Sequence, residues 1–252
     1  MRFALALLLG LLLAPGARAA DPPSAFTPAQ RAEIVAIVRH ALVADPSILR
    51  EAAAALQASE AARQAETARV AIAAAGPSLT AEPGDPVAGN PHGDVTVVEF
   101  YDLRCPYCRR MAPVMESLLR HDPKVRLVYK DIPILGPGSV LGARAVLAAQ
   151  RQDGYARLQA LLLRGNPQIT QESLHAAAKE AGLDWDRLQR DMKDPAIATR
   201  INANLDLARK LGVDGTPAFV IGKDMLPGAL ELADLEAAVK AAREATGASR
   251  SD

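Results

Sequence analysis

The chain has 252 residues, of which half are hydrophobic, with 29 basic side chains, 29 acidic side chains and two cysteines. Removing Arg2 and Arg18, both within the first twenty residues, leaves 27 basic against 29 acidic groups, a net charge of about −2. This balance argues against nucleic acid or an anionic membrane as the main partner. One cysteine pair in so long a chain excludes a disulfide-stapled scaffold, and the length allows one large core or two domains.

The N-terminal stretch MRFALALLLGLLLAPGARAA has the pattern of a secretory signal peptide. Arg2 precedes an apolar run from Phe3 to Ala14, and small residues surround a cleavage site after Ala19. The run is too short for a typical membrane span, so a retained anchor is the weaker alternative. We therefore predict a signal peptide over residues 1–19 and export to an oxidising compartment.

Residues 26–75 predict a helical domain. Thr27 is suited to cap a first helix with Pro28 at its first position, and Ile34, Val38 and Leu42 recur at helical spacing. Asp45 and Pro46 break this helix, and Ser47 is the expected cap of a second one. The second helix is rich in alanine with a thin apolar stripe, which is typical of an association element.

The rest of the chain predicts an α/β domain. Residues 76–94 are dense in glycine and proline and are expected to form a linker. From Val95 to Thr246 the order is strand, helix, strand, a block of helices over about 139–210, strand and terminal helix. Residues 247–252 are expected to be a disordered tail.

Both cysteines lie in VVEFYDLRCPYCRRM, where a β-branched strand gives way to an amphipathic helix. Cys105 stands at the predicted N-terminus of that helix, where the helix dipole and free N–H groups favour thiolate. Arg104, Arg109 and Arg110 add positive charge nearby. We predict Cys105 as the attacking nucleophile and Cys108, one turn further on, as the resolving thiol.

Two other interpretations of the pair were weighed. A structural disulfide over so short a loop would constrain the unfolded chain very little. A zinc site needs four ligands, and none of the four histidines is spaced as a ligand beside the pair; they are His40, His92, His121 and His175. We expect no metal and no cofactor other than the redox-active disulfide, with Cu(I) bound by the two thiols as the alternative.

Glu99 is an acid inside an otherwise apolar strand, six residues before Cys105. Burial of a carboxyl is costly unless the group is paired or serves in proton transfer. The alternative is that Glu99 lies on the polar face of the strand and points to solvent.

The stretches FYDLRCPYCRR, VYKDIPILGPGS and GVDGTPAFVIG resemble the thioredoxin-fold proteins of the DsbA family. The helices ahead of the catalytic region make the chain most similar to the ScsC-type, copper-tolerance-associated branch, close to the Com1-like proteins. The catalytic resemblance covers roughly Val95 to Thr246. It implies a thioredoxin fold with a helical insertion, preceded by an N-terminal helical oligomerisation segment.

The resemblance also implies roles for individual residues. Pro217 matches a cis-proline that faces the active-site pair, and Thr216 matches the preceding position, which helps to select substrates. Pro106 and Tyr107, between the cysteines, are expected to contact substrate as well. The strongly oxidising members carry histidine where this chain has Tyr107.

At the resolving thiol, the resemblance implies that Glu99 shuttles the proton of Cys108. The family often places a lysine on the next strand near this acid, and Lys130 matches it. Lys130 is therefore expected to modulate the charge of Glu99.

The implied function is that of a periplasmic thiol–disulfide oxidoreductase, with disulfide isomerisation or reduction favoured by an association segment at residues 26–75. The expected partners are unfolded or wrongly disulfide-bonded exported proteins, a membrane redox partner and further copies of the chain, with a homotrimer as the specific expectation. A monomeric dithiol oxidase is the first alternative, and a copper-binding protein that uses Cys105 and Cys108 is the second.

Overall fold

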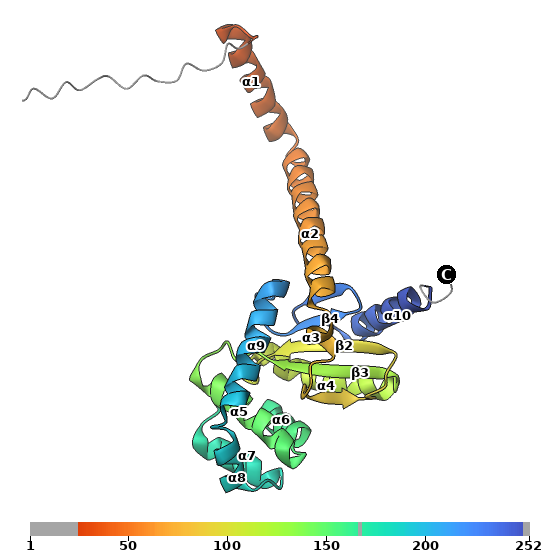
Figure 1. Ribbon diagram of the computed structural model, residues 1–252. Helices are drawn as coiled ribbons and strands as arrows, with labels where there is room; N and C mark the ends of the chain where they lie inside the picture. Colours follow the sequence, from red (N-terminus) through yellow and green to blue (C-terminus); the bar gives the residue numbers. More distant parts are fainter. Residues whose placement is uncertain (1–24, 166–167, 249–252) are drawn as a thin grey trace, which may run out of the picture. The chain divides into compact units, whose positions relative to one another are not determined.

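The computed structural model describes residues 25–165 and 168–248 (Figure 1). The expected signal peptide, residues 1–19, lies outside the described residues. The chain divides into two compact units after Ser59, and each unit is described by itself. Among the described helices, none combines the length and apolar character that crossing a membrane requires.

The N-terminal unit consists of α1 (Pro28–Ala44) and the first part of α2 (Ser47–Ala75). Thr27 caps α1 as expected, in a capping box with Gln30. At the start of α2 the expected cap is wrong. The carboxylate of Asp45 accepts hydrogen bonds from the backbone N–H and the hydroxyl of Ser47, so Asp45 supplies the capping acceptor.

The second unit is built on a five-stranded mixed sheet with the order β1-β3-β2-β4-β5. The strands are β1 (Val87–Gly89), β2 (Val95–Tyr101), β3 (Val125–Asp131), β4 (Ala218–Ile221) and β5 (Asp224–Pro227). Strands β2 and β3 are parallel and are joined by α4 (Pro106–His121), whereas the other neighbouring strands are antiparallel. A parallel pair needs such a crossover helix.

Five helices lie between β3 and β4, and α10 (Leu232–Ala248) closes the described chain. The five are α5 (Pro137–Ala149), α6 (Tyr155–Arg164), α7 (Gln171–Glu180), α8 (Trp185–Asp191) and α9 (Pro195–Leu211), with the short 3-10 helix η1 (Gln150–Gln152) after α5. Their apolar side chains form a core of their own that extends to Cys105 and Cys108. The expected α/β fold with a helical insertion is confirmed.

The two faces of the sheet are covered by different helices. On one face, which we call the α4 face, Val97, Leu127 and Phe219 pack against α4 and α10. On the opposite face, the α9 face, Val98, Phe100 and Val128 pack with Leu207 and other residues of α9 and with Ile72 near the end of α2. Alternation along each strand assigns neighbouring residues to opposite faces.

The expected linker over residues 76–94 is wrong, because this segment belongs to the folded unit. It contains α3 (Pro77–Thr80), whose Leu79 is buried on the α9 face, and β1, which pairs with β3 at the sheet edge. Arg126 and Lys130 of β3 donate to backbone carbonyls of α3 and fix it to the sheet. A three-residue edge strand is too short to show alternation in a sequence rich in glycine and proline.

The expected tail differs as well. Gly247 and Ala248 belong to α10, and residues 249–252 lie outside the described residues.

Candidate active site

The two cysteines lie where β2 gives way to α4. Cys105 is the N-cap residue of α4, Pro106 is its first residue, and the N–H of Cys105 donates to the carbonyl of Asp102 at 3.0 Å. Cys105 is 5% exposed and Cys108 is 1% exposed, and both are free thiols. This is the dithiol state of a pair in which the first sulfur is nearer the surface.

The surroundings of Cys105 favour its thiolate. Its pKa is lowered from 9.0 to about 5, chiefly because the thiol of Cys108 donates a hydrogen bond to its sulfur. The side chain of Thr216 and the backbone N–H groups of Cys108 and Tyr107 act in the same direction, against the effect of burial. At neutral pH, Cys105 is therefore the reactive nucleophile of the pair.

Cys108 has the opposite character. Its pKa is raised, first because its proton is held in the hydrogen bond to Cys105 and second because the thiol is buried. A negative charge on Glu99 raises it further. Cys108 must therefore lose its proton to a nearby base before it can attack.

Each of the three arginines beside the pair has a partner other than the cysteines. Arg104 donates to the carbonyl of Leu135, and Arg109 donates to the carbonyls of Leu162 and Gly165 at the end of α6. Arg110 stacks over the ring of Tyr107, with 4.3 Å from its guanidinium carbon to the ring centre. Hydrogen bonds from Cys108, Thr216 and the backbone are the largest causes that lower the pKa of Cys105. Backbone and aromatic partners direct these guanidinium groups to other contacts.

Thr216 and Pro217, which precede β4, bring a distant part of the chain to Cys105. The Thr216–Pro217 peptide bond is cis, as predicted. Cys105 Sγ lies 3.1 Å from the carbonyl oxygen of Thr216, within the reach of a hydrogen bond from the protonated thiol. Pro106 and Tyr107, which follow Cys105 in the chain, are exposed. The structure thus gathers four of the predicted residues around Cys105, and their contacts with substrate stay predictions.

Glu99 is buried on the α4 face of β2, so the solvent-facing alternative is wrong. Burial, followed by the negative charge of Asp131, raises its pKa from 4.5 to about 8. Its charge in turn acts on Cys108. This arrangement is compatible with proton exchange between Glu99 and Cys108, which stays a prediction.

The prediction for Lys130 is wrong. Lys130 is paired across the strands with Phe100, whereas Glu99 is paired with Tyr129, so Lys130 and Glu99 lie on opposite faces of the sheet. The ammonium of Lys130 binds Asp85 at 2.6 Å and the carbonyl of Ser78 at 2.8 Å. Its charge is used to fix the segment before β1.

Sequence reasoning missed Asp102. Its buried carboxylate accepts hydrogen bonds from the backbone N–H groups of Arg104, Ile134 and Leu135 and from the hydroxyl of Ser139, all at 2.8–3.0 Å. It therefore joins the loop before α4 to the loop before α5. An aspartate whose carboxylate accepts from the N–H two residues later is a recognisable turn pattern in a sequence. The distant partners of Asp102, near the start of α5, cannot be recognised in this way.

Sequence reasoning also missed a buried polar cluster at the ends of β2 and β3. Asp131 accepts hydrogen bonds from the hydroxyls of Tyr101 and Tyr155, at 2.6 and 3.0 Å. Tyr101 and Asp131 are cross-strand partners, while Tyr155 begins α6. The sequence predicted a strand at Asp131 but not that its side chain is buried, because the register between β2 and β3 was unknown.

A metal site would need several ligating side chains close together in the described part of the chain. There, no group of three or more histidine, cysteine, aspartate or glutamate side chains is placed to hold a metal ion. Cys105 and Cys108 alone remain as thiol ligands.

Comparisons with known proteins were consistent with this geometry. Residues 96–240 match the model of the DSBA-like thioredoxin domain, and residues 30–63 match that of the copper resistance protein ScsC N-terminal domain. A thioredoxin-like oxidoreductase from Silicibacter pomeroyi is 45% identical, covering 67% of this chain and 98% of that one, with a TM-score of 0.66. ScsC from Proteus mirabilis, in a transitional conformation, is 33% identical, covering 87% and 99% of the two chains, with a TM-score of 0.65.

A curated relative, Na(+)/H(+) antiporter NhaA 3 from Salinispora tropica, is 32% identical over 160 residues. The match covers 63% of this chain and 24% of the antiporter. The chain therefore spans about a quarter of the length of that relative.

Proposed function

Because this chain belongs to the family of DSBA-like thioredoxin domains, we propose that it is a thiol–disulfide oxidoreductase that acts on exported proteins through Cys105 and Cys108. The observation that carries the proposal is the contrast within the pair. The pKa of Cys105 is lowered to about 5 and that of the adjacent Cys108 is raised. The thiolate of Cys105 can attack while Cys108 keeps its proton. The proposed reaction uses the redox-active disulfide and no separate cofactor.

In the first step, the thiolate of Cys105 attacks one sulfur of a substrate disulfide. A Cys105–substrate disulfide forms, the substrate disulfide breaks, and the other substrate sulfur leaves as a thiolate. In the second step, Cys108 gives its proton to the carboxylate of Glu99 and attacks Cys105 Sγ. The Cys105–Cys108 disulfide forms, the mixed disulfide breaks, and the substrate leaves reduced by two electrons.

For isomerisation, the freed substrate thiolate attacks a second disulfide of the substrate before Cys108 reacts. A later substrate thiolate then displaces Cys105, and no net electrons are transferred. Disulfides of the substrate are exchanged and the enzyme returns to its dithiol state.

We propose that substrate lies along the surface formed by Thr216, Pro106 and Tyr107. The backbone before Pro217 lies beside Cys105 and offers a site where an extended peptide can add as a strand. Tyr107 is 51% exposed, and three apolar side chains of the neighbouring segment are also exposed: Ile134, Leu135 and Val140. Extended, unfolded chains expose the apolar side chains and free backbone groups that such a surface binds.

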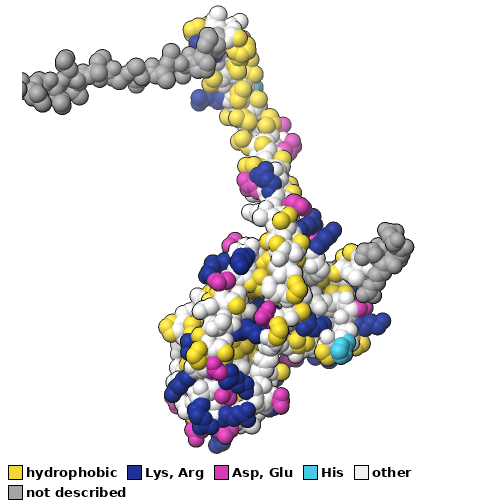
Figure 2. Space-filling view, in the orientation of Figure 1, with side chains coloured by type: hydrophobic (Ala, Val, Ile, Leu, Met, Phe, Trp, Pro, Cys, Tyr) yellow, Lys and Arg dark blue, Asp and Glu magenta, His cyan; other side chains and the backbone are white. Residues whose placement is uncertain are grey.

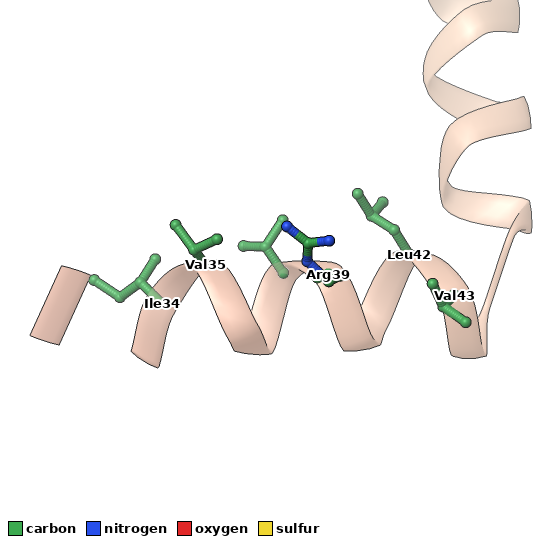
Figure 3. A pocket seen from close by; sticks show the side chains of 6 residues that line it. Ile34, Val35, Arg39, Leu42 and Val43 are labelled. Carbon is green, nitrogen blue, oxygen red and sulfur yellow. The ribbon is translucent and has the colours of Figure 1, made fainter. Parts of the chain in front are cut away.

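The helical segment at residues 26–75 favours isomerisation or reduction within an oligomer. No residue of α1 is buried, and several of its exposed apolar side chains lie next to one another on its surface (Figures 2 and 3). They include Ile34, Val35, Val38 and Val43. A contiguous exposed apolar face is typical of an interaction site. We propose that it associates with further copies of the chain, as a homotrimer.

The sequence pattern of residues 1–19 supports a location outside the cytosol. Residues 1–19 have the pattern of a signal peptide, and the acidic thiol of Cys105 beside Cys108 is suited to disulfide exchange outside the cytosol. We propose the periplasm as the location and a membrane protein as the partner that resets the redox state of the pair.

A dithiol oxidase is the second candidate. A thiolate at Cys105 stabilises the reduced protein relative to the disulfide form, and this makes the disulfide a stronger oxidant. Tyr107 is not hydrogen-bonded to Cys105 through its side chain; its ring instead carries Arg110. An isomerase acts in its dithiol form on a substrate with wrong disulfides. An oxidase acts in its disulfide form on a reduced substrate.

The deciding experiment supplies the dithiol protein to a substrate with scrambled disulfides and measures recovery of native substrate. Recovery that is lost in Cys105→Ser supports isomerisation. If the dithiol protein gives no recovery while its disulfide form rapidly oxidises a reduced substrate, the protein is an oxidase. If neither form exchanges disulfides and the protein binds Cu(I) stoichiometrically through the pair, the oxidoreductase proposal is wrong.

The association proposal has a test of its own. Val38→Asp places a charge on the apolar side of α1, whereas His40→Asp places the same charge about 200° around the helix. Light scattering is expected to report a trimer for the unaltered protein and for His40→Asp, and a smaller species for Val38→Asp. A monomer for all three proteins would contradict the proposal.

A further inference from the structure

Two buried carboxyls lie on the α4 face of neighbouring strands. Glu99 is on β2 and Asp131 is on β3, and their cross-strand partners are Tyr129 and Tyr101. The four residues therefore form two adjacent pairs on one face of a parallel ladder. Glu99 is 4% exposed and Asp131 is 2% exposed. In the proposed exchange reaction, Glu99 accepts the proton of Cys108, and Asp131 has no role.

Asp131 is held by hydroxyl donors on both of its carboxyl oxygens. Tyr101 donates to Oδ1 at 2.6 Å and Tyr155 donates to Oδ2 at 3.0 Å, and the two hydroxyls lie 2.7 Å apart. The backbone carbonyl of Asp131 also accepts from the amide of Asn204 on α9 at 3.3 Å. Strands β2 and β3 and helices α6 and α9 thus define the position of this carboxyl.

Hydrogen bonds from tyrosines satisfy Asp131 without neutralising it. Among the described residues, no ion pair joins either Asp131 or Glu99 to a lysine or an arginine. A buried carboxyl without a cation is costly to the fold. The burial of Asp131 and Glu99 therefore indicates a functional role and not a contribution to stability.

The two carboxyls interact electrostatically. Burial raises the pKa of Asp131 to about 7, and the hydroxyls of Tyr101 and Tyr155 oppose this effect. The pKa of Glu99 is raised to about 8 by burial and then by the charge of Asp131. The hydroxyl donors of Tyr101 and Tyr155 favour the ionised form of Asp131, and its negative charge makes the carboxylate of Glu99 hold a proton more strongly.

We propose that Asp131 is a positioning residue for the resolving step: fixed by Tyr101 and Tyr155, its charge makes Glu99 a stronger base toward the thiol of Cys108. The inference rests on the proposed function. In the step concerned, the S–H bond of Cys108 breaks, the proton passes to the carboxylate of Glu99, and the thiolate attacks Cys105 Sγ and releases the substrate thiolate. Asp131 neither gains nor loses a bond in this step.

Other groups that titrate or carry charge face the two carboxyls or act on their cluster. They are Tyr101, Asp102, Tyr129 and Tyr155, the thiols of Cys105 and Cys108 on α4, and Glu116 further along α4. The charge of Asp102 acts on Asp131, and that of Glu116 acts on Tyr129. Lys130 lies on the opposite face and is bound to Asp85.

Asp131→Asn tests the inference because it removes the charge and keeps the size of the side chain. In the full-length dithiol protein, carbon NMR follows the titration of the Glu99 carboxyl, and Glu99→Gln identifies its signal. The titration midpoint of Glu99 is expected to fall by about one pH unit in Asp131→Asn. The pH profile for release of a Cys105 mixed disulfide is expected to shift toward acid by a similar amount.

Two tyrosine variants sharpen the test. Tyr155→Phe removes one donor to Asp131, so Asp131 is less often ionised and the midpoint of Glu99 should fall by less than in Asp131→Asn. Tyr129→Phe is the matched control, since its ring packs against both Tyr101 and Tyr155 while the described hydrogen bonds of Asp131 come from the other two tyrosines. No shift is expected in Tyr129→Phe.

An unchanged Glu99 midpoint in folded Asp131→Asn would overturn the inference, and so would a loss of rate at every pH without a shift of the profile. The NMR titration needs no enzymatic activity. If the unaltered protein fails to exchange disulfides while the Glu99 midpoint still responds to Asp131→Asn, the proposed function is wrong and the electrostatic coupling remains. If exchange proceeds and the midpoint does not respond, only the role of Asp131 is wrong.

Discussion

The two faces of the central sheet hold buried acids in opposite surroundings. On the α9 face, Asp85 binds Lys130 at 2.6 Å and Arg200 at 2.8 Å, and its side chain is 1% exposed. On the α4 face, Glu99 and Asp131 are also buried, and Asp131 accepts hydrogen bonds from the hydroxyls of Tyr101 and Tyr155. The same strands, β2 and β3, separate the two environments.

The comparison indicates which acid serves the fold and which serves the chemistry. Asp85 ties the segment before β1 to β3 and α9, where its charge is balanced by two cations. Glu99 and Asp131 have no such balance and lie on the face covered by the helix that carries Cys108. Removal of an acid should therefore cost stability on the α9 face and alter reactivity on the α4 face.

The largest effect is expected at Asp85. Asp85→Ala leaves Lys130 and Arg200 without their buried counter-charge, and the free energy of unfolding should fall by about 3–5 kcal/mol. Denaturant unfolding measures this loss. The control is Asp224→Ala, which breaks an ion pair with Arg69 between half-exposed side chains and should cost about 0–1 kcal/mol. Equal losses in the two variants would show that burial of the pair does not matter.

The next effect concerns the thiol pair itself. Cys108→Ala removes the main hydrogen-bond donor to the sulfur of Cys105, so the pKa of Cys105 should rise from about 5 by one unit or more. Thiolate absorbance near 240 nm, followed against pH in the reduced protein, reports this value. A midpoint that stays near 5 in Cys108→Ala would assign the acidity to the helix terminus and the Thr216 side chain instead.

A change spread over several pH units is expected in the pH dependence of stability. The pKa of Glu99 is raised in the fold from 4.5 to about 8, so its contribution to stability is fully present below pH 4.5 and is lost as the pH rises through 8. Glu99→Gln removes this dependence, and the free energy of unfolding should decline less steeply over that window. The difference in slope is at most about 1.4 kcal/mol per pH unit.

The disulfide form is the right sample for this measurement. In the dithiol form, the lowered pKa of Cys105 has the opposite sign: its contribution is present above pH 9 and is lost as the pH falls through 5. The two effects offset each other over much of the same range. Identical slopes for the oxidised unaltered protein and oxidised Glu99→Gln would mean that Glu99 does not titrate in this window.

The two faces of the sheet also show which features could be predicted from the sequence and which could not. The sequence of strands β2, β3 and β4 along the chain, the helical insertion and the residues around Cys105 followed from local patterns and from the resemblance, whereas the short strands β1 and β5 were not predicted. The assignment of Lys130 to Glu99 failed because it depended on the register between β2 and β3. A shift of one residue moves a side chain to the other face, and no local pattern specifies that register.

The buried clusters were missed for a related reason. Asp131 and Tyr155 are joined by a hydrogen bond between a strand end and a helix start, and Asp85 meets Arg200 across 115 residues. Such pairs depend on tertiary packing, which periodicity does not encode. Asp85 was assigned to a linker because its neighbours are glycine and proline, although its partners on β3 and α9 hold it in the fold.

The smallest effect is expected at Arg110, and it separates two explanations of the acidic thiol. The sequence predicted that the arginines near Cys105 lower its pKa, whereas in the structure Arg110 stacks on the exposed ring of Tyr107. Because an exposed charge is screened by water, Arg110→Ala should shift the thiolate midpoint of Cys105 by no more than about 0.3 pH unit. Thiolate absorbance in Arg110→Ala, compared with Cys108→Ala, tests this directly. A shift in Arg110→Ala as large as that in Cys108→Ala would restore the arginine explanation and weaken the assignment of Cys108 as the donor.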